Sequence, residues 1–495
     1  MGSTQRFVLG VDIGTSSSKG VLVDLSGHVV ASASRSHDVD RPRVGHVEMD
    51  ADLWWAEFRS LSLELTGQTD GEVIAVGVSG MGPCVLITDE NNEPLRPAIL
   101  YGVDSRAHEQ IARLGDRFGT AQILERCGSA LSSQAVGPKL AWIADNEPTV
   151  WARARRLYMP ASWLAFNLTG AYLLDHQSAS QSTPLYDVSE LGWHSPWADE
   201  LRGAITLPRL AWPGDTAGYV TPEAATSTGL PAGIPVIVGT IDAWSEAVSV
   251  DAQNAGDLML MYGTTLFLVA TGTKSLSHPA LWGTVGAYPG TYNFAAGMAT
   301  SGAITAWLAK LFGDVDYPTL LAEAALSRPG ANGLLMLPYF AGERTPINDP
   351  NARGVVVGLT LEHTRGDIYR AALEATAFGI RHNVEQMRAA GAAIERIAAV
   401  GGGTQGGLWT EIVSNVTGLV QEVATTTIGA SYGAAYLASR LVADTAIAEW
   451  NPPQARVEPD PALRELYDDL FAGYLRLYPD TRELAHHLAA VQHSA

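Results

Sequence analysis

The stretch FVLGVDIGTSSSKGVLVD, from Phe7 to Asp24, places a polar tip between two apolar runs. The flanks are rich in β-branched and apolar residues, which predicts two paired strands joined by a turn. The tip, Gly14 to Ser18, offers backbone N–H groups and hydroxyls that can hydrogen-bond an anion, and Asp12 ahead of it can hold an accompanying cation. A hydrophilic hairpin without a ligand uses the same residue types, so this stretch alone leaves both interpretations open.

The composition is that of a globular protein with several domains. The chain has 495 residues, of which 46% are hydrophobic and 17% charged. A formal net charge of -20 argues against nucleic acid or an anionic membrane as the main partner. Cys84 and Cys127 are the only cysteines, which excludes a disulfide framework and a cysteine-rich zinc site. No signal-peptide pattern or run of about 18 apolar residues occurs, so we expect a cytoplasmic protein.

The hairpin pattern occurs twice. The stretch DLMLMYGTTLFLVATGT, residues 257–273, again sets a glycine and hydroxyls between two apolar runs. In both halves the hairpin is followed by an amphipathic helix and then by a strand that ends in glycine, EVIAVGVSG in the first half and ERIAAVGGG in the second. We therefore expect a duplicated α/β domain, with residues 1–250 and 251–495 as two halves that face each other across a cleft. Asp460 should begin a C-terminal helical tail.

The segment GGGTQG, residues 401–406, allows two interpretations. Gly401, Gly403 and Gly406 satisfy G-x-G-x-x-G, and Glu422 lies at a suitable distance for a ribose contact, as in dinucleotide-binding dehydrogenases. That interpretation leaves the duplicated hairpins unexplained. The same glycines also suit a mononucleotide, because a backbone without Cβ lets a base or ribose approach closely. A P-loop is excluded, since the sequence has no Gly-Lys dipeptide.

Taken together, these features resemble the FGGY carbohydrate kinases, which have the actin-like ATPase fold. The segment GVVVGLTLEHTRGDIYRAALE, Gly354 to Glu374, matches the second signature of that family. The supporting motifs keep the family order: VDIGTSSSK, HVEMDADLWW, PYFAGERTP and GGGTQGGLWTEIVSNVTG. The first signature, around GPKLAWIADNEP, departs from the family pattern at its start. The resemblance implies two duplicated actin-like ATPase (ribonuclease H-like) domains of the α/β class.

The resemblance also implies where ATP and Mg²⁺ bind. Asp12 would hold Mg²⁺ through water. Gly302 would lie near the nucleotide, although a close-packed helix start explains this glycine equally well. The residues expected to cradle the phosphates are Gly14, Thr15, Ser16, Gly263, Thr264 and Thr265, and those expected to line the adenosine pocket are Gly401, Gly402, Gly403 and Thr404.

On the acceptor side, Asp242 follows the apolar strand PVIVGTI and matches the catalytic Asp of the family. Phosphorylating a hydroxyl requires a group that takes its proton, which a carboxylate can do. A helix N-cap is the alternative role for this Asp. The sugar contacts implied by the family fall on Met81, Gly82, Tyr101, Asp104 and Arg106. Arg106 is equally well explained as a structural partner of Asp104.

We therefore expect an ATP- and Mg²⁺-dependent kinase that phosphorylates a hydroxyl of a small sugar, above all a ketopentose such as xylulose or ribulose. Family members that act on D-xylulose typically carry Gln-Met-His where this chain has Met81-Gly82-Pro83, and often Asn where it has Ala243. Both changes remove hydrogen-bond capacity, so a sugar alcohol or an aldonic acid remains an alternative acceptor. An actin-like protein that binds ATP without transferring phosphate is a more distant one. Proteins that this chain resembles are commonly homodimers.

Overall fold

The structure, a computed structural model, describes residues 5–493 and divides the chain into two compact units. Unit 1 contains the residues up to 254 together with 273–293 and 426–452. Unit 2 contains 255–272, 294–425 and the residues from 453 onward. The chain thus returns twice to unit 1 after its first passage into unit 2.

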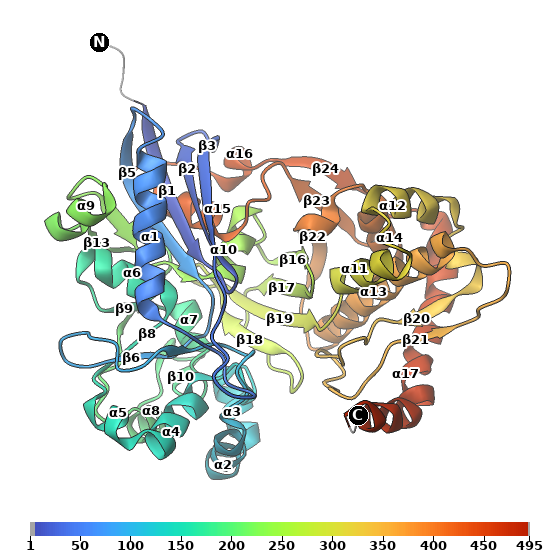
Figure 1. The fold of residues 1–495 in the computed structure, drawn as a ribbon, viewed down its shortest axis with the longest axis horizontal. Helices are drawn as coiled ribbons and strands as arrows, with labels where there is room; N and C mark the ends of the chain where they lie inside the picture. The colour runs from blue at the N-terminus through green and yellow to red at the C-terminus, as the bar shows by residue number, and fades with distance from the viewer. Residues whose placement is uncertain (1–4, 494–495) are drawn as a thin grey trace. The chain divides into compact units, whose positions relative to one another are not determined.

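Unit 1 is built on a mixed sheet (Figure 1). Its strand order is β13-β14-β5-β1-β2-β3, and β15 also pairs with β5. Strands β1, β2 and β3 form an antiparallel meander, whereas β5 runs parallel to β1, and β14 and β15 run parallel to β5. The strands of this sheet are β1 Arg6–Ile13, β2 Ser17–Asp24, β3 Val29–Ser36, β5 Glu72–Gly80, β13 Thr216–Tyr219, β14 Pro235–Ile237 and β15 Thr240–Ile241.

The predicted first hairpin forms with a shorter turn than expected. Strand β2 begins at Ser17, so Ser17 and Ser18 belong to the strand and the turn is limited to Gly14, Thr15 and Ser16. The reason is tertiary, because the Ser18 hydroxyl is fully buried and donates to Glu57 Oε2 at 2.5 Å. A serine that loses its water but gains a carboxylate acceptor is stable inside a sheet.

Two helices cover opposite faces of the unit 1 sheet. Gly10 pairs with Val21 and Gly20 with Val11, so the two glycines point to opposite faces. A Cβ on Gly10 would lie 2.0 Å from the Ser431 carbonyl of α15 (Ala430–Ser439), and a Cβ on Gly20 would lie 2.8 Å from Leu65 of α1 (Ala51–Thr66). Close packing of both helices therefore depends on glycine at these two strand positions.

Unit 2 repeats the same topology. The second large sheet has the strand order β18-β19-β17-β16-β22-β23-β24, with β17 antiparallel to β16, β22 parallel to β16, β23 parallel to β22, and β24 antiparallel to β23. From β19 to β24 this order matches β3-β2-β1-β5-β14-β13 of unit 1, which confirms the predicted duplication of an α/β domain. The strands are β16 Gly256–Tyr262, β17 Leu266–Gly272, β19 Tyr292–Met298, β22 Ile394–Val400, β23 Val420–Ala424 and β24 Pro453–Val457.

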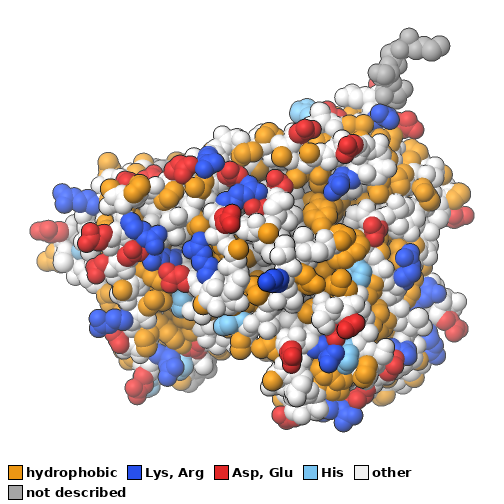
Figure 2. All heavy atoms as spheres, turned by 180° about the vertical axis from the view of Figure 1, so that it is seen from behind, with side chains coloured by type: hydrophobic (Ala, Val, Ile, Leu, Met, Phe, Trp, Pro, Cys, Tyr) orange, Lys and Arg blue, Asp and Glu red, His pale blue; other side chains and the backbone are white. Residues whose placement is uncertain are grey.

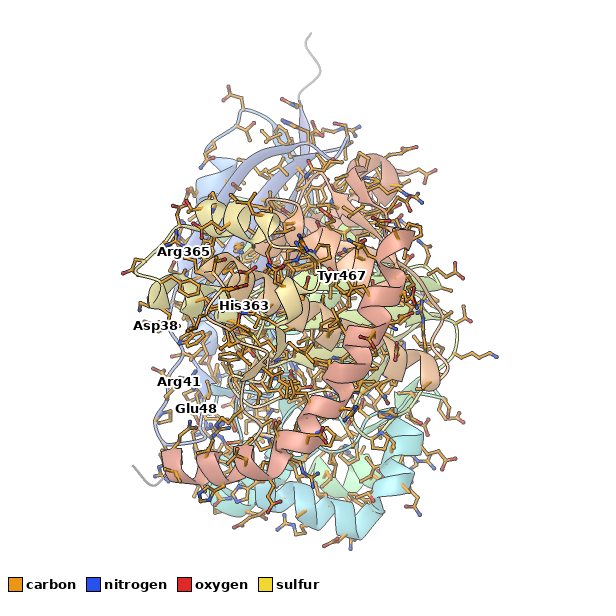
Figure 3. All side chains as sticks on the ribbon, turned by 90° about the vertical axis from the view of Figure 1, so that its right-hand side faces the viewer. Asp38, Arg41, Glu48, His363, Arg365 and Tyr467 are labelled. Carbon is orange, nitrogen blue, oxygen red and sulfur yellow. The ribbon has the colours of Figure 1, made fainter. Side chains whose placement is uncertain are left out.

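The signature segment starts the long helix α13 (Arg365–Ala389), the counterpart of α1. Thr364 caps α13 and forms a capping box with Asp367. One turn later, Arg370 Nε donates to Glu374 Oε1 at 2.8 Å, and the hydroxyl of Tyr467 donates to the same oxygen at 3.0 Å. Figure 3 shows Arg365 at the start of α13 and Tyr467 on α17. The most recognisable motif of the sequence is therefore a structural brace inside unit 2.

The remaining elements complete the two units. In unit 1 they are β4 Glu48–Met49, β6 Leu86–Thr88, β7 Ala98–Ile99, α2 His108–Phe118, α3 Thr120–Cys127, α4 Val136–Asn146, α5 Pro148–Arg153, β8 Arg156–Tyr158, α6 Pro160–Thr169, β9 Leu173–Asp175, α7 His176–Ser180, β10 Tyr186–Asp187, β11 Gly192–Trp193, α8 Ser195–Leu201, β12 Arg209–Ala211, α9 Pro222–Thr228, α10 Asp242–Ser249, β18 Trp282–Val285 and α16 Ile447–Trp450. In unit 2 they are α11 Gly302–Leu311, α12 Tyr317–Leu326, η1 Ala331–Gly333, β20 Leu335–Leu337, β21 Val355–Val357, η2 Gly402–Thr404, α14 Leu408–Thr417, η3 Pro461–Leu463 and α17 Arg464–His493.

Candidate active site

Three strands of unit 1 end at one edge of its sheet and bring polar side chains together there. Asp12 of β1 is in register with Ser79 of β5, and Ser79 is in register with Thr240 of β15. Ser79 Oγ donates to Asp12 Oδ1 at 2.8 Å, and Asp242 begins α10 directly after β15. Because the carboxyl ends of parallel strands in α/β sheets are where ligands bind, this edge is the candidate site of unit 1.

The carboxyl groups at this edge interact. Burial raises the pKa of Asp12 well above the usual range of a carboxyl group, and the charges of Asp242 and Glu246 raise it further. Burial also raises the pKa of Asp242. The pKa of Glu246 rises to about 7, again chiefly through burial and then through the charge of Asp242, while Lys19 opposes the shift. Three carboxyl groups in a poorly solvated place repel one another when ionised, and a cation would relieve that repulsion.

The donor set at this edge fits a cation that keeps its own water. Within residues 5–493, no three His, Cys, Asp or Glu side chains are arranged to ligate one metal ion. A cation bound beside Asp12 would therefore take one or two carboxylate oxygens and complete its shell with water, as Mg²⁺ characteristically does. The carboxylates present suit Mg²⁺ better than a transition metal, which prefers imidazole or thiolate ligands.

Asp242 itself is not the capping residue of α10. The N-cap is Ile241, and Asp242 occupies the first helical position, where its Oδ1 accepts from the N–H of Ala243 at 2.7 Å. Its second oxygen, Oδ2, has no hydrogen-bond donor among the described residues. A carboxylate with one oxygen anchored and a raised pKa is a group that can accept a proton near neutral pH.

The turn Gly14–Ser16 lies beside Asp12. The N–H of Gly14 donates to the carbonyl of Ser17 at 3.1 Å, and the hydroxyls of Thr15 and Tyr101 are 2.8 Å apart. In the part of the chain that the structure describes, the N–H groups of Thr15 and Ser16 donate to no protein acceptor. Adjacent N–H groups of this kind form an anion-binding turn.

Two of the predicted sugar-contact residues lie next to this edge. The N–H of Met81 donates to the carbonyl of Ile13 at 2.7 Å, which ties the segment after β5 to the end of β1. A Cβ on Gly82 would lie 2.7 Å from Ile241, the residue before Asp242. Met81 is fully buried, whereas Gly82 and Tyr101 are half-buried. The segment from Met81 to Gly82 thus packs directly against the start of α10.

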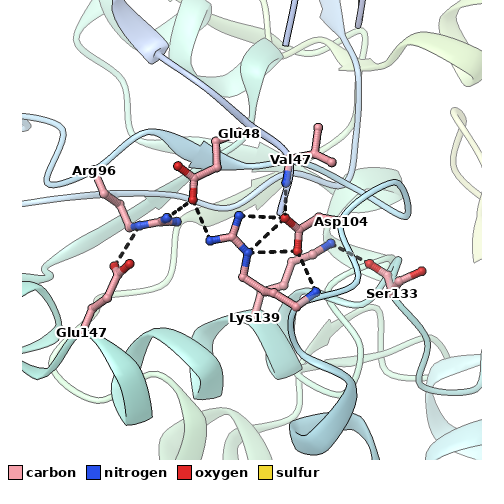
Figure 4. A network of polar contacts seen from close by, with 8 residues as sticks. Val47, Glu48, Arg96, Asp104, Ser133, Lys139 and Glu147 are labelled. Atoms are coloured by element: carbon pink, nitrogen blue, oxygen red, sulfur yellow. Dashed lines mark hydrogen bonds and ion pairs between the residues drawn. The ribbon is translucent and has the colours of Figure 1, made fainter. Parts of the chain in front are cut away.

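Asp104, which is labelled in Figure 4, forms an internal ion pair with Arg106. Arg106 donates to both oxygens of Asp104, at 3.0 Å from Nε and 2.7 Å from Nη2, and the N–H of Val47 also donates to Asp104 at 2.6 Å. Arg106 further donates to Glu48 at 2.6 Å. Asp104 is 1% exposed, and its oxygens are engaged by protein donors. The structural interpretation of Arg106 is therefore observed, while a direct role of either residue towards sugar stays a prediction.

The same network extends to Lys139 of the first signature. Its Nζ donates to the Ser133 carbonyl at 2.6 Å, and burial lowers the pKa of Lys139 to about 8. The hydroxyl of Ser133 donates to the carbonyl of Gly102, so Lys139 supports the segment that carries Tyr101. Removing either member of the buried Asp104–Arg106 pair would leave the other unpaired, at a cost of about 3–5 kcal/mol.

In unit 2, the turn Gly263–Thr265 is hydrogen-bonded to the start of α11. The N–H of Gly302 donates to the Gly263 carbonyl at 2.9 Å, and the N–H of Ala303 donates to the Thr264 carbonyl at 3.1 Å. A Cβ on Gly302 would lie 2.7 Å from the Gly263 oxygen. Gly302 is thus both a close-packed helix start and a direct support of this turn.

The glycine segment after β22 reaches the same end of unit 2. Gly401 has a φ of 92°, and a Cβ on it would lie 2.5 Å from the Tyr262 carbonyl. A Cβ on Gly403 would lie 2.8 Å from Tyr262, whereas one on Gly402 would meet open space. The hydroxyl of Thr404 donates to the Gly401 carbonyl at 2.8 Å. Since Tyr262 directly precedes Gly263, the residues predicted to bind nucleotide in unit 2 gather at one place.

One charged residue of the unit 1 site was missed by the sequence reasoning. Glu246 lies four residues after Asp242, a spacing that puts both side chains on one face of α10. That spacing was the available signal. A Cβ on Gly429, just before α15, would lie 3.5 Å from the Glu246 carboxylate, which places Glu246 between α10 and α15.

The chain matches two models of one family. The model of the N-terminal domain of the FGGY family of carbohydrate kinases matches residues 7–249, and that of the C-terminal domain matches residues 258–442. The chain belongs to the FGGY family of carbohydrate kinases. Its members share the actin-like ATPase fold, so the predicted family and fold class are confirmed.

The most similar relatives agree with this assignment. The chain is 30% identical to the xylulose kinase of Klebsiella pneumoniae over 448 residues, which are 88% of this chain and 90% of the relative. It is also 30% identical to the glycerol kinase of Nocardia farcinica over 403 residues, 78% of this chain and 79% of the relative. Among solved structures, the xylulose kinase from Rhodospirillum rubrum superposes with a TM-score of 0.90 at 31% identity, covering 97% of this chain and 100% of that one.

This FGGY kinase is therefore an enzyme that phosphorylates a small sugar with ATP as co-substrate. Membership in a kinase family replaces the dehydrogenase interpretation of Gly401–Gly406. On the face seen in Figure 2, Lys and Arg side chains are interspersed with Asp and Glu and do not form one basic patch. No helix among residues 5–493 is long and apolar enough to cross a membrane.

Proposed function

We propose that this FGGY kinase phosphorylates a ketopentose, with xylulose as the first candidate, in an Mg²⁺-dependent reaction whose general base is Asp242. The observation that carries the proposal is the edge of the unit 1 sheet, where one oxygen of Asp242 has no donor among residues 5–493 and lies beside the buried Asp12. The names of the Klebsiella pneumoniae and Rhodospirillum rubrum relatives support xylulose as the acceptor.

In this proposal, Asp242 takes the proton of the acceptor hydroxyl as the new O–P bond forms. Asp12 holds Mg²⁺ through water, and the ion would supply charge neutralisation on the phosphates. The N–H groups of Thr15 and Ser16 hydrogen-bond phosphate oxygens, because they are adjacent and have no acceptor within the described part of the chain. The other proposed phosphate contacts are Gly14, Gly263, Thr264 and Thr265.

The glycines of unit 2 are proposed to serve the nucleotide. Gly401, Gly403 and Gly302 keep the backbone close to Tyr262 and Gly263, which leaves Gly402 and Thr404 at the surface of the same segment for adenosine. Any side chain at Gly401 would collide with the backbone that carries the turn, so the shape of the adenosine pocket depends on these glycines.

For the sugar, Met81, Gly82 and Tyr101 are proposed to contact the acceptor directly because they adjoin Ile241 and Thr15. Asp104 and Arg106 remain proposed sugar contacts, and their mutual pairing also fixes the loop that carries Tyr101. The N–H of Asp104 donates to the carbonyl of Tyr101 at 3.0 Å, which links the pair to that tyrosine. A cytoplasmic location is proposed as well, since the two buried free thiols, Cys84 and Cys127, suit a reducing compartment. A homodimer is proposed from the family resemblance alone.

The test is ADP release from MgATP in the presence of ketopentoses, pentitols, glycerol and aldonic acids, with Asp242→Asn measured beside the wild type. We expect one ketopentose to stimulate release and Asp242→Asn to lower kcat about 10³-fold while MgATP still binds. A matched control is Asp199→Asn, which removes a carboxylate that is 61% exposed at the surface of unit 1. If only glycerol or an aldonic acid stimulates ADP release, the acceptor is not a ketopentose. If Asp242→Asn keeps the wild-type kcat, Asp242 is not the general base.

A further inference from the structure

His37 directly follows β3 and contacts the turn Gly14–Ser16 at two points. Its backbone N–H donates to the Ser16 carbonyl at 3.1 Å. Its ring nitrogen Nε2 lies 3.1 Å from the Gly14 carbonyl oxygen. One residue, distant in sequence from the turn, therefore engages the carbonyls at both of its ends.

The other ring nitrogen of His37 faces a buried carboxylate. Nδ1 lies 2.9 Å from Oε2 and 3.1 Å from Oε1 of Glu57, a residue of α1. Glu57 Oε2 also accepts from the hydroxyl of Ser18 at 2.5 Å. The side chains of His37 and Glu57 are only 5% and 10% exposed, so water contributes little to this arrangement.

Both ring nitrogens of His37 thus face acceptors, a carbonyl on one side and a carboxylate on the other. A neutral imidazole carries one N–H and can donate to only one of them, whereas the imidazolium donates to both. A hydrogen bond that involves a charged group is also stronger than a neutral one, particularly where water is excluded. His37 thus links the carboxylate of Glu57 on α1 to the carbonyl of Gly14 in the turn.

We infer that His37, backed by Glu57, is a positioning residue that fixes the turn Gly14–Ser16 in the conformation that binds ATP. With the carbonyls of Gly14 and Ser16 both engaged, the peptide units between them are restrained, and the N–H groups of Thr15 and Ser16 keep their direction. Preorganised donors bind an anion without a reorganisation cost. This inference rests on the proposed function, in which that turn binds the phosphates.

A second link between β3 and α1 shows what a purely structural role would look like. Two residues before His37, Arg35 Nε donates to Ser60 Oγ at 3.0 Å, and its Nη2 pairs with Glu64 Oε2 at 2.5 Å. Arg35 and His37 point to the same face of the strand, towards α1. Arg35 bonds to no residue of the turn, so it ties the helix to the sheet without positioning the phosphate donors.

The experiment compares His37→Gln, Glu57→Gln and the matched control Arg35→Gln in the full chain. In His37→Gln a single amide nitrogen replaces two ring nitrogens that face different acceptors, so we expect KM and Kd for MgATP to rise about tenfold while kcat and the acceptor KM change less than about threefold. Glu57→Gln keeps the shape of its side chain and should raise the same two constants about fivefold. Arg35→Gln should lower the Tm about as much as His37→Gln does, because both variants lose contacts between β3 and α1. It should leave KM and Kd for MgATP at their wild-type values.

Two outcomes overturn the inference. One is a folded His37→Gln protein with wild-type KM and Kd for MgATP, and the other is an equal rise of these constants in Arg35→Gln. Where His37→Gln fails to fold, Glu57→Gln carries the same test. The Kd for MgATP can be measured by tryptophan fluorescence without any acceptor. If the wild type phosphorylates no sugar in the panel, the proposed function is contradicted, but the effect of His37→Gln on this Kd can still be measured.

Discussion

The turn Gly14–Ser16 of unit 1 and the turn Gly263–Thr265 of unit 2 have the same pattern in sequence but different supports. In unit 1 two side chains contact the turn in addition to backbone bonds, since the ring of His37 contacts Gly14 and the hydroxyl of Tyr101 contacts Thr15. In unit 2 backbone holds it, since the N–H groups of Gly302 and Ala303 donate to the turn carbonyls. We therefore expect the turn of unit 1 to respond to changes of its side-chain partners and the turn of unit 2 to a Cβ at the start of α11.

The two sheet edges also differ in charge. Asp12 of β1 corresponds to Met261 of β16, because each lies two residues before the glycine of its turn. The edge in unit 1 therefore collects carboxylates, whereas the corresponding strand position in unit 2 is apolar. The repeated fold supplies two turns proposed to bind phosphate, and Asp12 together with Asp242 and Glu246 adds acidic groups beside the turn of unit 1. Four predictions test this contrast, and the one with the largest expected effect comes first.

Removing the charge that distinguishes unit 1 should have the largest effect. We expect Asp12→Asn to lower kcat/KM for MgATP about 10²-fold and to raise the Mg²⁺ concentration required for half-maximal rate, because the variant loses the carboxylate beside the phosphates. Steady-state ADP release at varied Mg²⁺ measures both quantities. The corresponding change in unit 2, Met261→Asn, should not alter the Mg²⁺ requirement. An unchanged requirement in Asp12→Asn would mean that the cation is held elsewhere.

A Cβ at the backbone support of unit 2 should have the next largest effect. Gly302→Ala places a methyl group 2.7 Å from the Gly263 oxygen, so the turn must shift. We expect KM for MgATP to rise about tenfold. Gly272→Ala is the control, because a Cβ on Gly272 meets nothing within 4 Å. If both variants have the wild-type KM for MgATP, ATP binding does not depend on the close contact between Gly302 and Gly263, and the proposed role of this backbone support is wrong.

A pH effect on stability should arise near the same support. Glu343 accepts from the N–H of Ala299, three residues before Gly302, and burial raises the pKa of Glu343 to about 8. The folded state therefore binds a proton that the unfolded state releases near pH 4.5, and the free energy of unfolding falls as the pH rises from about 5 to 8. Between pH 5.5 and 8.5, the free energy of unfolding should therefore fall about 2 kcal/mol less in Glu343→Gln than in the wild type. Urea unfolding at the two pH values measures this difference. Equal slopes for the two proteins would contradict the assignment.

The smallest effect is expected from the hydroxyl contact in unit 1. Thr15→Val keeps the shape of the side chain but removes the hydrogen bond to Tyr101. The loss of one partly exposed neutral hydrogen bond corresponds to about 1 kcal/mol, so we expect KM for the sugar to rise about fivefold. Kinetics at saturating MgATP measure this constant. In Tyr101→Phe the same bond is lost, and a double variant with no further effect would show that the two residues act as a pair.

Much of the fold could be predicted because it depends on local patterns. Strand β5 coincides with EVIAVGVSG, and α1 and α13 are the amphipathic helices predicted after the two hairpins, since apolar spacing encodes which face is buried. The length of the first turn was predicted wrongly, because nothing local to Ser17 and Ser18 reveals that Glu57 of a later helix completes a strand there.

The sequence by itself determined the duplication, the two turns, and the placement of Asp12 and Asp242 at strand ends, because strand periodicity and turn residues are properties of neighbouring positions. Only the tertiary structure decided that Arg106 saturates Asp104, that Glu246 joins the carboxylates, and that His37 spans Glu57 and Gly14. Each of these depends on which segments approach one another, and the burial that results changes the charge and hydrogen-bonding state of a side chain in ways no local pattern encodes.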